Sequence, residues 1–302
     1  MEQVELVRLP SQADVFGRRL VRARLSPRSR GPVHESFPLK LPSVQLNYRP
    51  RKANPRRLDE YNELIGTTGL TAPFVHVMAT PVVGALITRE DFPLPAQSMF
   101  DLANTITQHR PIDASEALSF RVHAKNPLPH DAGVQVEIHS EAWSGEECVW
   151  SEVASYVCTA VLLPGSGGLS LHQFQRTADA PPPPETEPPL TCEPVATWKL
   201  PADAGRTYAA ISGQRSAVHT SSLAAKGFGF KRAIAHGMET AARAFTLLNP
   251  PDAFEWETSF VRPVLLPSTV DIQTWVTGNT QGYRGADAKT NETTFVGTVT
   301  SK

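Results

Sequence analysis

The chain has few cysteines, no recognisable export signal and no long uninterrupted apolar run. Its three cysteines, Cys148, Cys158 and Cys192, are odd in number and lack CxxC spacing. This pattern indicates neither a disulfide framework nor a metal site, and it favours a reducing compartment. The opening residues, MEQVELVRLP, carry acids and lack the basic-then-apolar order of a secretion signal. A cytoplasmic location is therefore expected.

The most apolar stretch, residues 71–88, is marginal in length for a bilayer span and is interrupted by Pro73, His76 and Pro81. We expect no membrane span there but a buried helix, with its main part at residues 75–88. No acidic residue stands near His76 in this stretch, which favours a structural role for that histidine.

The charges nearly cancel over the 302 residues but are unevenly distributed. Residues 1–57 carry 13 Lys or Arg against 4 Asp or Glu. This segment is expected to be a solvated arm or a basic surface for an acidic partner. Its arginine-rich part, residues 18–30, has no interleaved aromatic residues and no recognition motif, so a nucleic-acid partner is not expected.

A proline-rich stretch divides the chain. Residues 180–194 contain seven prolines, which exclude a helix or a central strand and are typical of a stiff linker. The length of the chain also agrees with two domains of about 150 residues. We expect a basic N-terminal segment at 1–57, a first unit at 58–165, a linker at 166–197 and a second unit at 198–302.

Both halves show one apolar helix followed by alternating strands. In the second half, apolar residues recur at helical spacing over residues 234–248, and Pro250 ends the pattern. Alternating patterns follow at 118–122, 134–138 and 147–158 in the first half, and at 270–276 and 295–299 in the second. This order predicts an α+β fold in which each half wraps an antiparallel sheet around its helix. The two sheets are expected to join edge to edge, which protects their open edges.

The strongest functional pattern lies in residues 208–238. A polar cluster formed by Ser212, Gln214, Ser216 and His219 ends 18 residues before Gly237, which begins the second apolar helix. An imidazole suits proton transfer near neutral pH. A backbone N–H at the start of a helix has no partner within the helix and can stabilise a developing oxyanion. Together these groups suit proton transfer at the α-carbon of a thioester.

At these positions the chain resembles the MaoC-like dehydratases, also called (R)-specific enoyl-CoA hydratases, of the hotdog fold. Their motif runs Tyr-x-x-x-Ser-Gly-Asp-x-Asn-Pro-aliphatic-His, followed 18 residues on by the glycine of His-Gly-Met. The matching residues are Tyr208, Ser212, Gly213, Val218, His219, His236, Gly237 and Met238. Further segments resemble the double-hotdog subgroup of actinobacterial type: residues 198–206 in front of the motif, and Tyr61, 91–93, 110–111, 145–146 and 149–150 in the first half. The resemblance covers most of the chain from about Tyr61 onward.

Three positions depart from the motif. Gln214 stands where the family has its catalytic Asp, Ser216 replaces Asn and Ala217 replaces Pro. An amide can orient water but cannot exchange a proton, so Gln214 either orients water or merely satisfies its polar neighbours. Glu239 is the candidate for a relocated acid, although a carboxylate in a first helical turn is also favourable against the helix dipole. Phe245 stands where some single-domain members carry a serine.

The resemblance implies a double hotdog, two such units joined edge to edge, and an (R)-3-hydroxyacyl-thioester dehydratase, or trans-2-enoyl-CoA hydratase. It implies catalytic roles for His219, Gln214 and Gly237, and substrate contacts for Ser212, Ser216, His236 and Glu239. No cofactor or metal is expected, because the coenzyme A or acyl-carrier-protein group arrives with the substrate. We expect one active cleft per chain, with the first half supplying its wall and acyl pocket.

Other functions stay open at this point. The same cleft suits a non-catalytic acyl-thioester binding or accessory subunit, or a hotdog thioesterase that uses Glu239 as its carboxylate. A homodimer, or pairing with an active homologue, is compatible with each of these functions. The acyl chain length depends on pocket volume, which no motif encodes.

Overall fold

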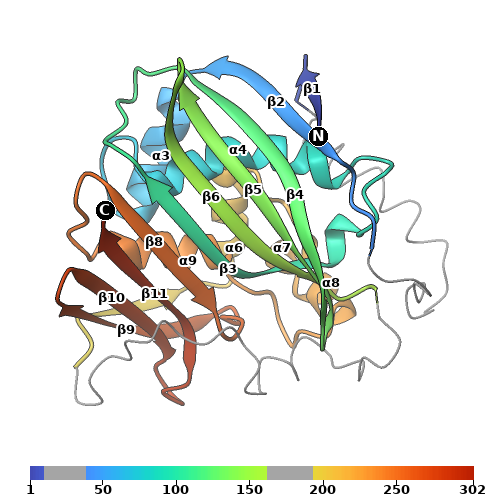
Figure 1. Cartoon of the computed structure of the whole chain (residues 1–302). Coiled ribbons are helices and arrows are strands. Elements are labelled where there is room, and N and C mark those ends of the chain that lie inside the picture. Colours follow the sequence, from blue (N-terminus) through green and yellow to red (C-terminus); the bar gives the residue numbers. More distant parts are fainter. Residues whose placement is uncertain (10–38, 162–192) are drawn as a thin grey trace.

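A computed structural model describes residues 1–9, 39–161 and 193–302. Within these ranges the strands form one large sheet, and the helices lie on one side of it (Figure 1). The strands are β1 Glu2–Leu6, β2 Val44–Arg51, β3 Met99–Gln108, β4 Leu118–His130, β5 Gly133–Ser144, β6 Glu147–Cys158, β7 Ala196–Leu200, β8 Phe254–Phe260, β9 Ser268–Thr277, β10 Thr280–Asp287 and β11 Thr293–Ser301. The helices are α3 Pro55–Ile65, α4 Ala72–Ile87, the 3₁₀ turn η1 Ala96–Ser98, α6 Ala204–Ser212, α7 Ala217–Thr220, α8 Ser222–Gly227 and α9 Gly237–Phe245.

The two halves of the chain contribute adjoining parts of this sheet. Its strand order is β1-β2-β4-β5-β6-β3-β8-β11-β10-β9-β7. The halves meet where β3 and β8 pair in antiparallel fashion, from Ala103 opposite Ser259 to Gln108 opposite Phe254. The predicted edge-to-edge joining is therefore confirmed, and each half covers an edge that would otherwise be exposed. Residues 166–192 of the predicted linker and 10–38 of the basic segment lie outside the described residues, β7 begins within the last part of the predicted linker, and the domain boundaries stay predictions.

The helix of the first half is buried, as the apolar run predicted. α4 packs against β4 and β5, and a helix that is apolar all round has to be buried in this way. It begins at Ala72, three residues before the predicted main part, because Pro73 fits a first helical turn, where its missing N–H costs nothing. No helix among the described residues is long and apolar enough to span a membrane.

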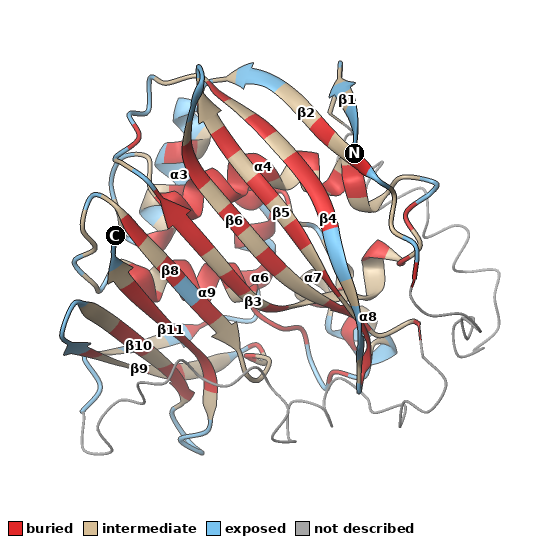
Figure 2. Cartoon of the chain, in the orientation of Figure 1, coloured by how far each residue is buried: buried red, intermediate tan, exposed pale blue. Residues whose placement is uncertain are grey.

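Buried and partly exposed residues alternate along the strands of the first half, as period-two patterning requires (Figure 2). Most buried positions carry apolar side chains that face the helices. Glu152 on β6 is an exception, since its side chain is only 2% exposed. A buried carboxylate needs a partner, and this one is described with the candidate site.

The helix of the second half is shorter than the sequence predicted. The expected range of 234–248 is wrong at both ends. Ile234 forms a β-bridge with Leu265, and His236 has the extended backbone of an N-cap, so α9 begins at Gly237. At the other end, Leu248 N–H bonds to the carbonyl of Phe245 in a tighter, three-residue turn.

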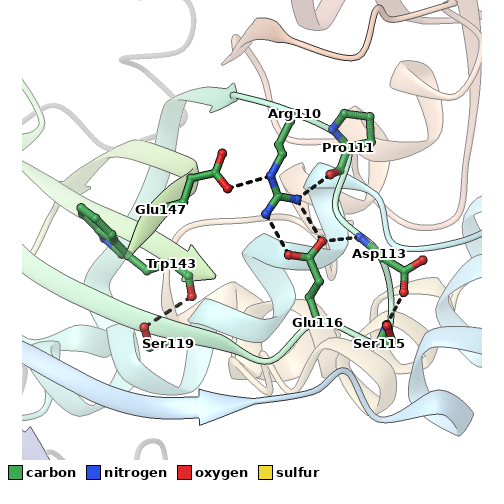
Figure 3. Close-up of polar contacts among 8 residues, drawn as sticks. All are labelled: Arg110, Pro111, Asp113, Ser115, Glu116, Ser119, Trp143 and Glu147. Atoms are coloured by element: carbon green, nitrogen blue, oxygen red, sulfur yellow. Dashed lines mark hydrogen bonds and ion pairs between the residues drawn. The ribbon is translucent and has the colours of Figure 1, made fainter. Parts of the chain in front are cut away.

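Arg110 organises the connection between β3 and β4 (Figure 3). Its guanidinium donates to both carboxylate oxygens of Glu116 at 2.9 Å and to Glu147 at 3.0 Å. It also donates to the carbonyl of Pro111, while Glu116 accepts from the backbone N–H of Asp113. The hydrogen bonds from Arg110 lower the pKa of Glu116 to about 2.

Replacing Arg110 by lysine should weaken this connection. A lysine is a point charge and cannot make the two parallel bonds to Glu116. Because the cluster is partly exposed, the expected loss is about 1 kcal/mol of unfolding free energy. The measurement is urea unfolding of Arg110→Lys at pH 7. Arg49→Lys, the same change at an exposed arginine, is the control, and an equal loss in both variants would contradict the assignment.

Candidate active site

A cavity lined by residues of both halves holds the residues that the motif singled out. Its wall includes His219, Gln214, Gly237, Ser212 and Ser216. The volume open to the centre of a water molecule is about 170 Å³. One water needs roughly 10–15 Å³ by this measure. The cavity therefore has room for part of an organic substrate.

Most of the remaining wall is apolar and comes from both halves. Apolar members are Pro81, Val83, Ile87, Ala96, Met99 and Phe100 of the first half, and Val218, Phe230, Ile234, Phe260 and Val264 of the second. The first half therefore supplies part of the wall, as expected, while its role as acyl pocket stays a prediction. However, the first half also contributes ionisable groups, because Asp101 of β3 and Tyr156 of β6 line the same cavity.

The loop that carries Gln214 is fixed at the end of α6. Gly213 has φ 86° and donates its N–H to the carbonyl of Ala209, a helix cap that favours glycine. Arg57 on α3 donates to the carbonyls of Ile211 and Ser212, the last two of this helix. These bonds satisfy carbonyls that lack helical partners and place a positive charge at the negative end of the helix. A residue of the first half thus holds the motif loop of the second.

His219 lies on α7 in a tautomer suited to accept a proton. Its Nδ1 is 3.0 Å from the carbonyl of Ile234, and a carbonyl only accepts, so Nδ1 carries the hydrogen and Nε2 is left with its lone pair. Protein surrounds the ring although part of the residue opens on the cavity. This burial lowers the pKa of His219 to about 4, so the imidazole is neutral at pH 7.

His236 supports both His219 and Gln214 but does not line the cavity. Its ring stacks on that of His219 with centroids 3.7 Å apart. Its Nε2 donates to the backbone carbonyl of Gln214 at 2.9 Å. Burial holds the pKa of His236 well below its ordinary value, so two neutral rings stack. His236 therefore positions the groups that reach the cavity.

Gly237 presents the first backbone N–H of α9. No acceptor bonds to this N–H in the described part of the chain, as is usual in a first helical turn. A Cβ at this position would lie 2.7 Å from the ring of Phe260, so glycine allows that ring to pack against the helix start. The N–H thus remains available to a ligand in the cavity.

Glu239 does not reach the cavity. Glu239 is buried, and its Oε2 has no partner among the described residues. Its charge acts on Tyr61 and Tyr208, both fully buried, and burial raises the pKa of Glu239 to about 7. Phe245, on the same helix, packs against Phe254 and Trp256 as a core residue.

The expectation that His76 has no acidic neighbour is wrong. Its Nδ1 lies 2.7 Å from Oε1 of Glu152 on β6, and both side chains are buried. Its Nε2 lies 3.3 Å from the amide nitrogen of Gln214. The sequence could not show this, because Glu152 is 76 residues away and only the wrapping of the sheet around α4 brings the two together.

Asp101 was not among the residues predicted from the sequence. This carboxyl lines the cavity and is hydrogen-bonded to Tyr156. Burial raises the pKa of Asp101 to about 6. Among the described residues no group of three or more His, Cys, Asp or Glu has an arrangement that could hold a metal ion.

Gly205 on α6 is a further residue that the motif alone did not single out, although it lies in the segment in front of the motif. A Cβ here would lie 2.2 Å from the carbonyl oxygen of His219. The backbones of α6 and α7 are therefore in direct contact, and glycine at position 205 sets the place of His219.

Comparison with known proteins agrees with this fold. The sequence pattern of the MaoC like domain matches residues 173–296. The 3-hydroxyacyl-thioester dehydratase X of Mycobacterium tuberculosis is 36% identical over 208 residues, which are 67% of this chain and 68% of the relative. The crystal structure of HtdX from Mycobacterium tuberculosis has a TM-score of 0.71 and 26% identity, covering 85% of this chain and 100% of that one.

More distant structures share the fold alone. A MaoC-like dehydratase from Phytophthora capsici has a TM-score of 0.63 at 17% identity, over 87% of this chain and 96% of that one. An acyl-ACP thioesterase from Bacteroides thetaiotaomicron has a TM-score of 0.54 at 10% identity, over 85% and 97%. Because the 3-hydroxyacyl-thioester dehydratase of Mycobacterium tuberculosis is 36% identical to it, the chain belongs to the MaoC-like dehydratase family, and it has the double-hotdog fold of that family.

Replacing Gly205 by alanine should displace His219. The added Cβ meets a backbone carbonyl, which cannot rotate away as a side chain could. We expect a loss of about 1–3 kcal/mol in unfolding free energy, as for other overpacked sites, and a lower melting temperature. Gly227→Ala is the matched control, because nothing lies within 4 Å of a Cβ there. Equal stability of the two variants would contradict the close contact.

Proposed function

We propose that the protein interconverts (R)-3-hydroxyacyl thioesters and trans-2-enoyl thioesters by removing or adding water. The observation that carries this proposal is that His219, Gln214 and Gly237 line one cavity between the two halves. The relative from Mycobacterium tuberculosis, named a 3-hydroxyacyl-thioester dehydratase, supports the same reaction.

The geometry supports the following course in the direction of dehydration. The N–H of Gly237 bonds to the thioester oxygen and stabilises the negative charge that develops there. Nε2 of His219 removes a proton from C2. The electron pair of that C–H bond forms the C2–C3 double bond, and the C3–O bond breaks. His219 then delivers the proton to the departing hydroxyl, so that water leaves and the imidazole is neutral again. Gln214 orients the hydroxyl through its amide.

The other proposed site residues fall into two groups, those that line the cavity and those that lie behind its wall. Ser212 and Ser216 line the cavity and are assigned to contacts with substrate or water. His236 and Glu239 lie behind the wall, so their contribution to substrate binding is indirect. The substrate is an acyl thioester of coenzyme A or of an acyl carrier protein. A cytoplasmic location, and a homodimer or pairing with an active homologue, stay predictions from the sequence.

The direct test is hydration of crotonyl-CoA, followed by loss of the enoyl absorbance. Wild-type protein should turn over, and His219→Ala should lose about 10²–10⁴-fold in rate, as for removal of a general acid or base. Longer enoyl-CoA substrates are tested in parallel. Absence of hydration above the His219→Ala background with every chain length would overturn the proposal, and affinity without turnover would identify a binding subunit.

Gln214→Asp is the companion variant in the same assay. A carboxylate can exchange a proton where the amide cannot. A large rise in rate would show that the native amide weakens the chemistry, whereas a fall would show that the site is adapted to it.

Glu239→Gln separates dehydration from thioester hydrolysis. Because Glu239 does not reach the cavity, we expect the variant to retain hydration, with no release of free thiol from acyl-CoA by either protein. Thiol release that disappears in Glu239→Gln would establish the thioesterase instead.

The same variant has a predicted pH signature in stability. The folded pKa of about 7 lies above the ordinary value near 4.3, so ionisation disfavours the folded state. Wild-type protein should therefore lose stability as pH rises from about 4.3 to 7, and Glu239→Gln should gain up to roughly 3 kcal/mol over it in that window. Glu63→Gln, the same change at an exposed position on α3, is the control in urea unfolding.

A further inference from the structure

We propose that the buried pair of His76 and Glu152 selects which end of the Gln214 amide faces the cavity. Gln214 then offers its carbonyl oxygen where the family motif has a carboxylate. His76 is thus a positioning residue supplied by the first half. This inference rests on the proposed dehydratase function and explains how a site with glutamine at position 214 carries it out.

The contacts form a chain from the sheet to the cavity. Glu152 on β6 bonds to Nδ1 of His76, and Nε2 of His76 faces the amide nitrogen of Gln214 at 3.3 Å. The same nitrogen lies 3.5 Å from the hydroxyl oxygen of Thr80. Gln214 itself lines the cavity. This series of contacts therefore begins at a buried carboxylate, that of Glu152, and ends at the side chain of Gln214, which the substrate can reach.

The hydrogen positions follow from the partners. A carboxylate of Glu152 accepts, so Nδ1 of His76 carries a hydrogen and, in the neutral ring, Nε2 accepts. Thr80 donates its hydroxyl hydrogen to the carbonyl of His76 at 3.0 Å, so its oxygen is also an acceptor toward Gln214. Two acceptors facing the same end of the amide select its NH₂ group there. The carbonyl oxygen of Gln214 is then turned away from α4 and is free to accept from the hydroxyl or water.

A proton on His76 would reverse this arrangement. Nε2 would then donate, and the carbonyl oxygen of Gln214 would have to turn toward it. The cavity would receive an NH₂ group, which cannot accept a hydrogen bond from water. The active form therefore requires neutral His76.

The charged surroundings place this titration apart from that of His219. Among the described residues, the charged groups that act on His76 are Glu152 of β6 and Asp101 of β3, and Tyr156 of β6 is in turn hydrogen-bonded to Asp101. Burial lowers the pKa of His76. The carboxylates of Glu152 and Asp101 raise this pKa by more than burial lowers it, so the net shift is upward. Activity should fall as pH drops through this raised value, well above the pKa of about 4 of His219.

Two substitutions at position 76 separate positioning from packing. His76→Asn keeps an amide donor for Glu152 but is too short to reach Gln214. His76→Gln places an acceptor near the position of Nε2 and cannot titrate. We expect kcat to fall about 10²-fold in His76→Asn, the scale of a misplaced reacting group. His76→Gln should recover much of this loss and lack the acidic limb attributed to His76. Equal losses in the two variants would overturn the proposal.

A double-mutant cycle tests whether His76 acts through Gln214. In a Gln214→Ala background, His76→Asn should cause almost no further loss of kcat, because the group that it positions is already gone. A purely structural His76 would reduce kcat by the same factor in both backgrounds. Melting temperatures of all variants show whether each is folded.

The pH profile of kcat/KM provides a signed readout. Glu152→Gln removes a carboxylate that raises the pKa of His76, so the acidic limb should move to lower pH. Asp101 also titrates in this range, and Asp101→Asn shows how much of the acidic limb is due to Asp101. If the limb disappears in Asp101→Asn and persists in His76→Gln, Asp101 is the group responsible and the proposal fails.

A measurement without turnover separates failure of this inference from failure of the proposed function. The side-chain amide of Gln214, assigned in ¹⁵N NMR spectra by its absence from Gln214→Ala, should shift with pH at the midpoint of His76. This shift should vanish in His76→Gln. An inactive wild type that shows the shift would refute the dehydratase while keeping the contact. An active wild type whose Gln214 signal is indifferent to His76 would refute the contact.

Discussion

The hydrogen-bonded pairing of β3 with β8 is the constraint on which the site depends. It fixes the two halves in one register, from Ala103 opposite Ser259 onward, and so presents the inner face of β6 and the helix α4 to the motif loop. Without this pairing, Gln214 and His76 would lie in two halves that the sheet does not hold together. Arg57 adds a second tie by holding the end of α6 from the first half. Of the proposed reacting groups, His219 and Gly237 thus lie on helices, and Gln214 lies on a loop whose start Arg57 holds, as a site of defined geometry requires.

The outline of the fold and the core of the site could be predicted from the sequence, because both depend on local patterns. Alternation gave the strands, and one motif placed His219 and Gly237 at a fixed spacing. The helix at residues 234–248 was predicted too long because periodicity does not detect a β-bridge such as that of Ile234 with Leu265. Apolar residues on a short extended segment satisfy a helical pattern by chance.

Contacts across the fold could not be predicted in this way. No local sequence pattern indicates the contact of His76 with Glu152. None indicates either that a Cβ at position 205 would clash with the backbone of His219. The position of Glu239 could have been anticipated, however. Gly237 and Thr240 are three residues apart and share the helix face that lines the cavity, whereas a residue two positions beyond Gly237 points to nearly the opposite side. Closeness in sequence to a site residue is therefore a poor guide on a helix.

The stack of His219 on His236 has a consequence for behaviour in acid. The ring centroids are 3.7 Å apart and both rings are surrounded by protein. A proton on either ring would therefore place a cation against the neighbouring ring in a site where water cannot solvate the charge. A proton would enter at the ring nitrogen that makes no backbone bond, Nε2 of His219 or Nδ1 of His236, so the bonds to the carbonyls of Ile234 and Gln214 would remain. Because the folded pKa values of both rings are lowered, the unfolded state takes up protons in acid that the folded stack does not, and the stability that the stack contributes is lost for both rings as pH falls below their ordinary pKa.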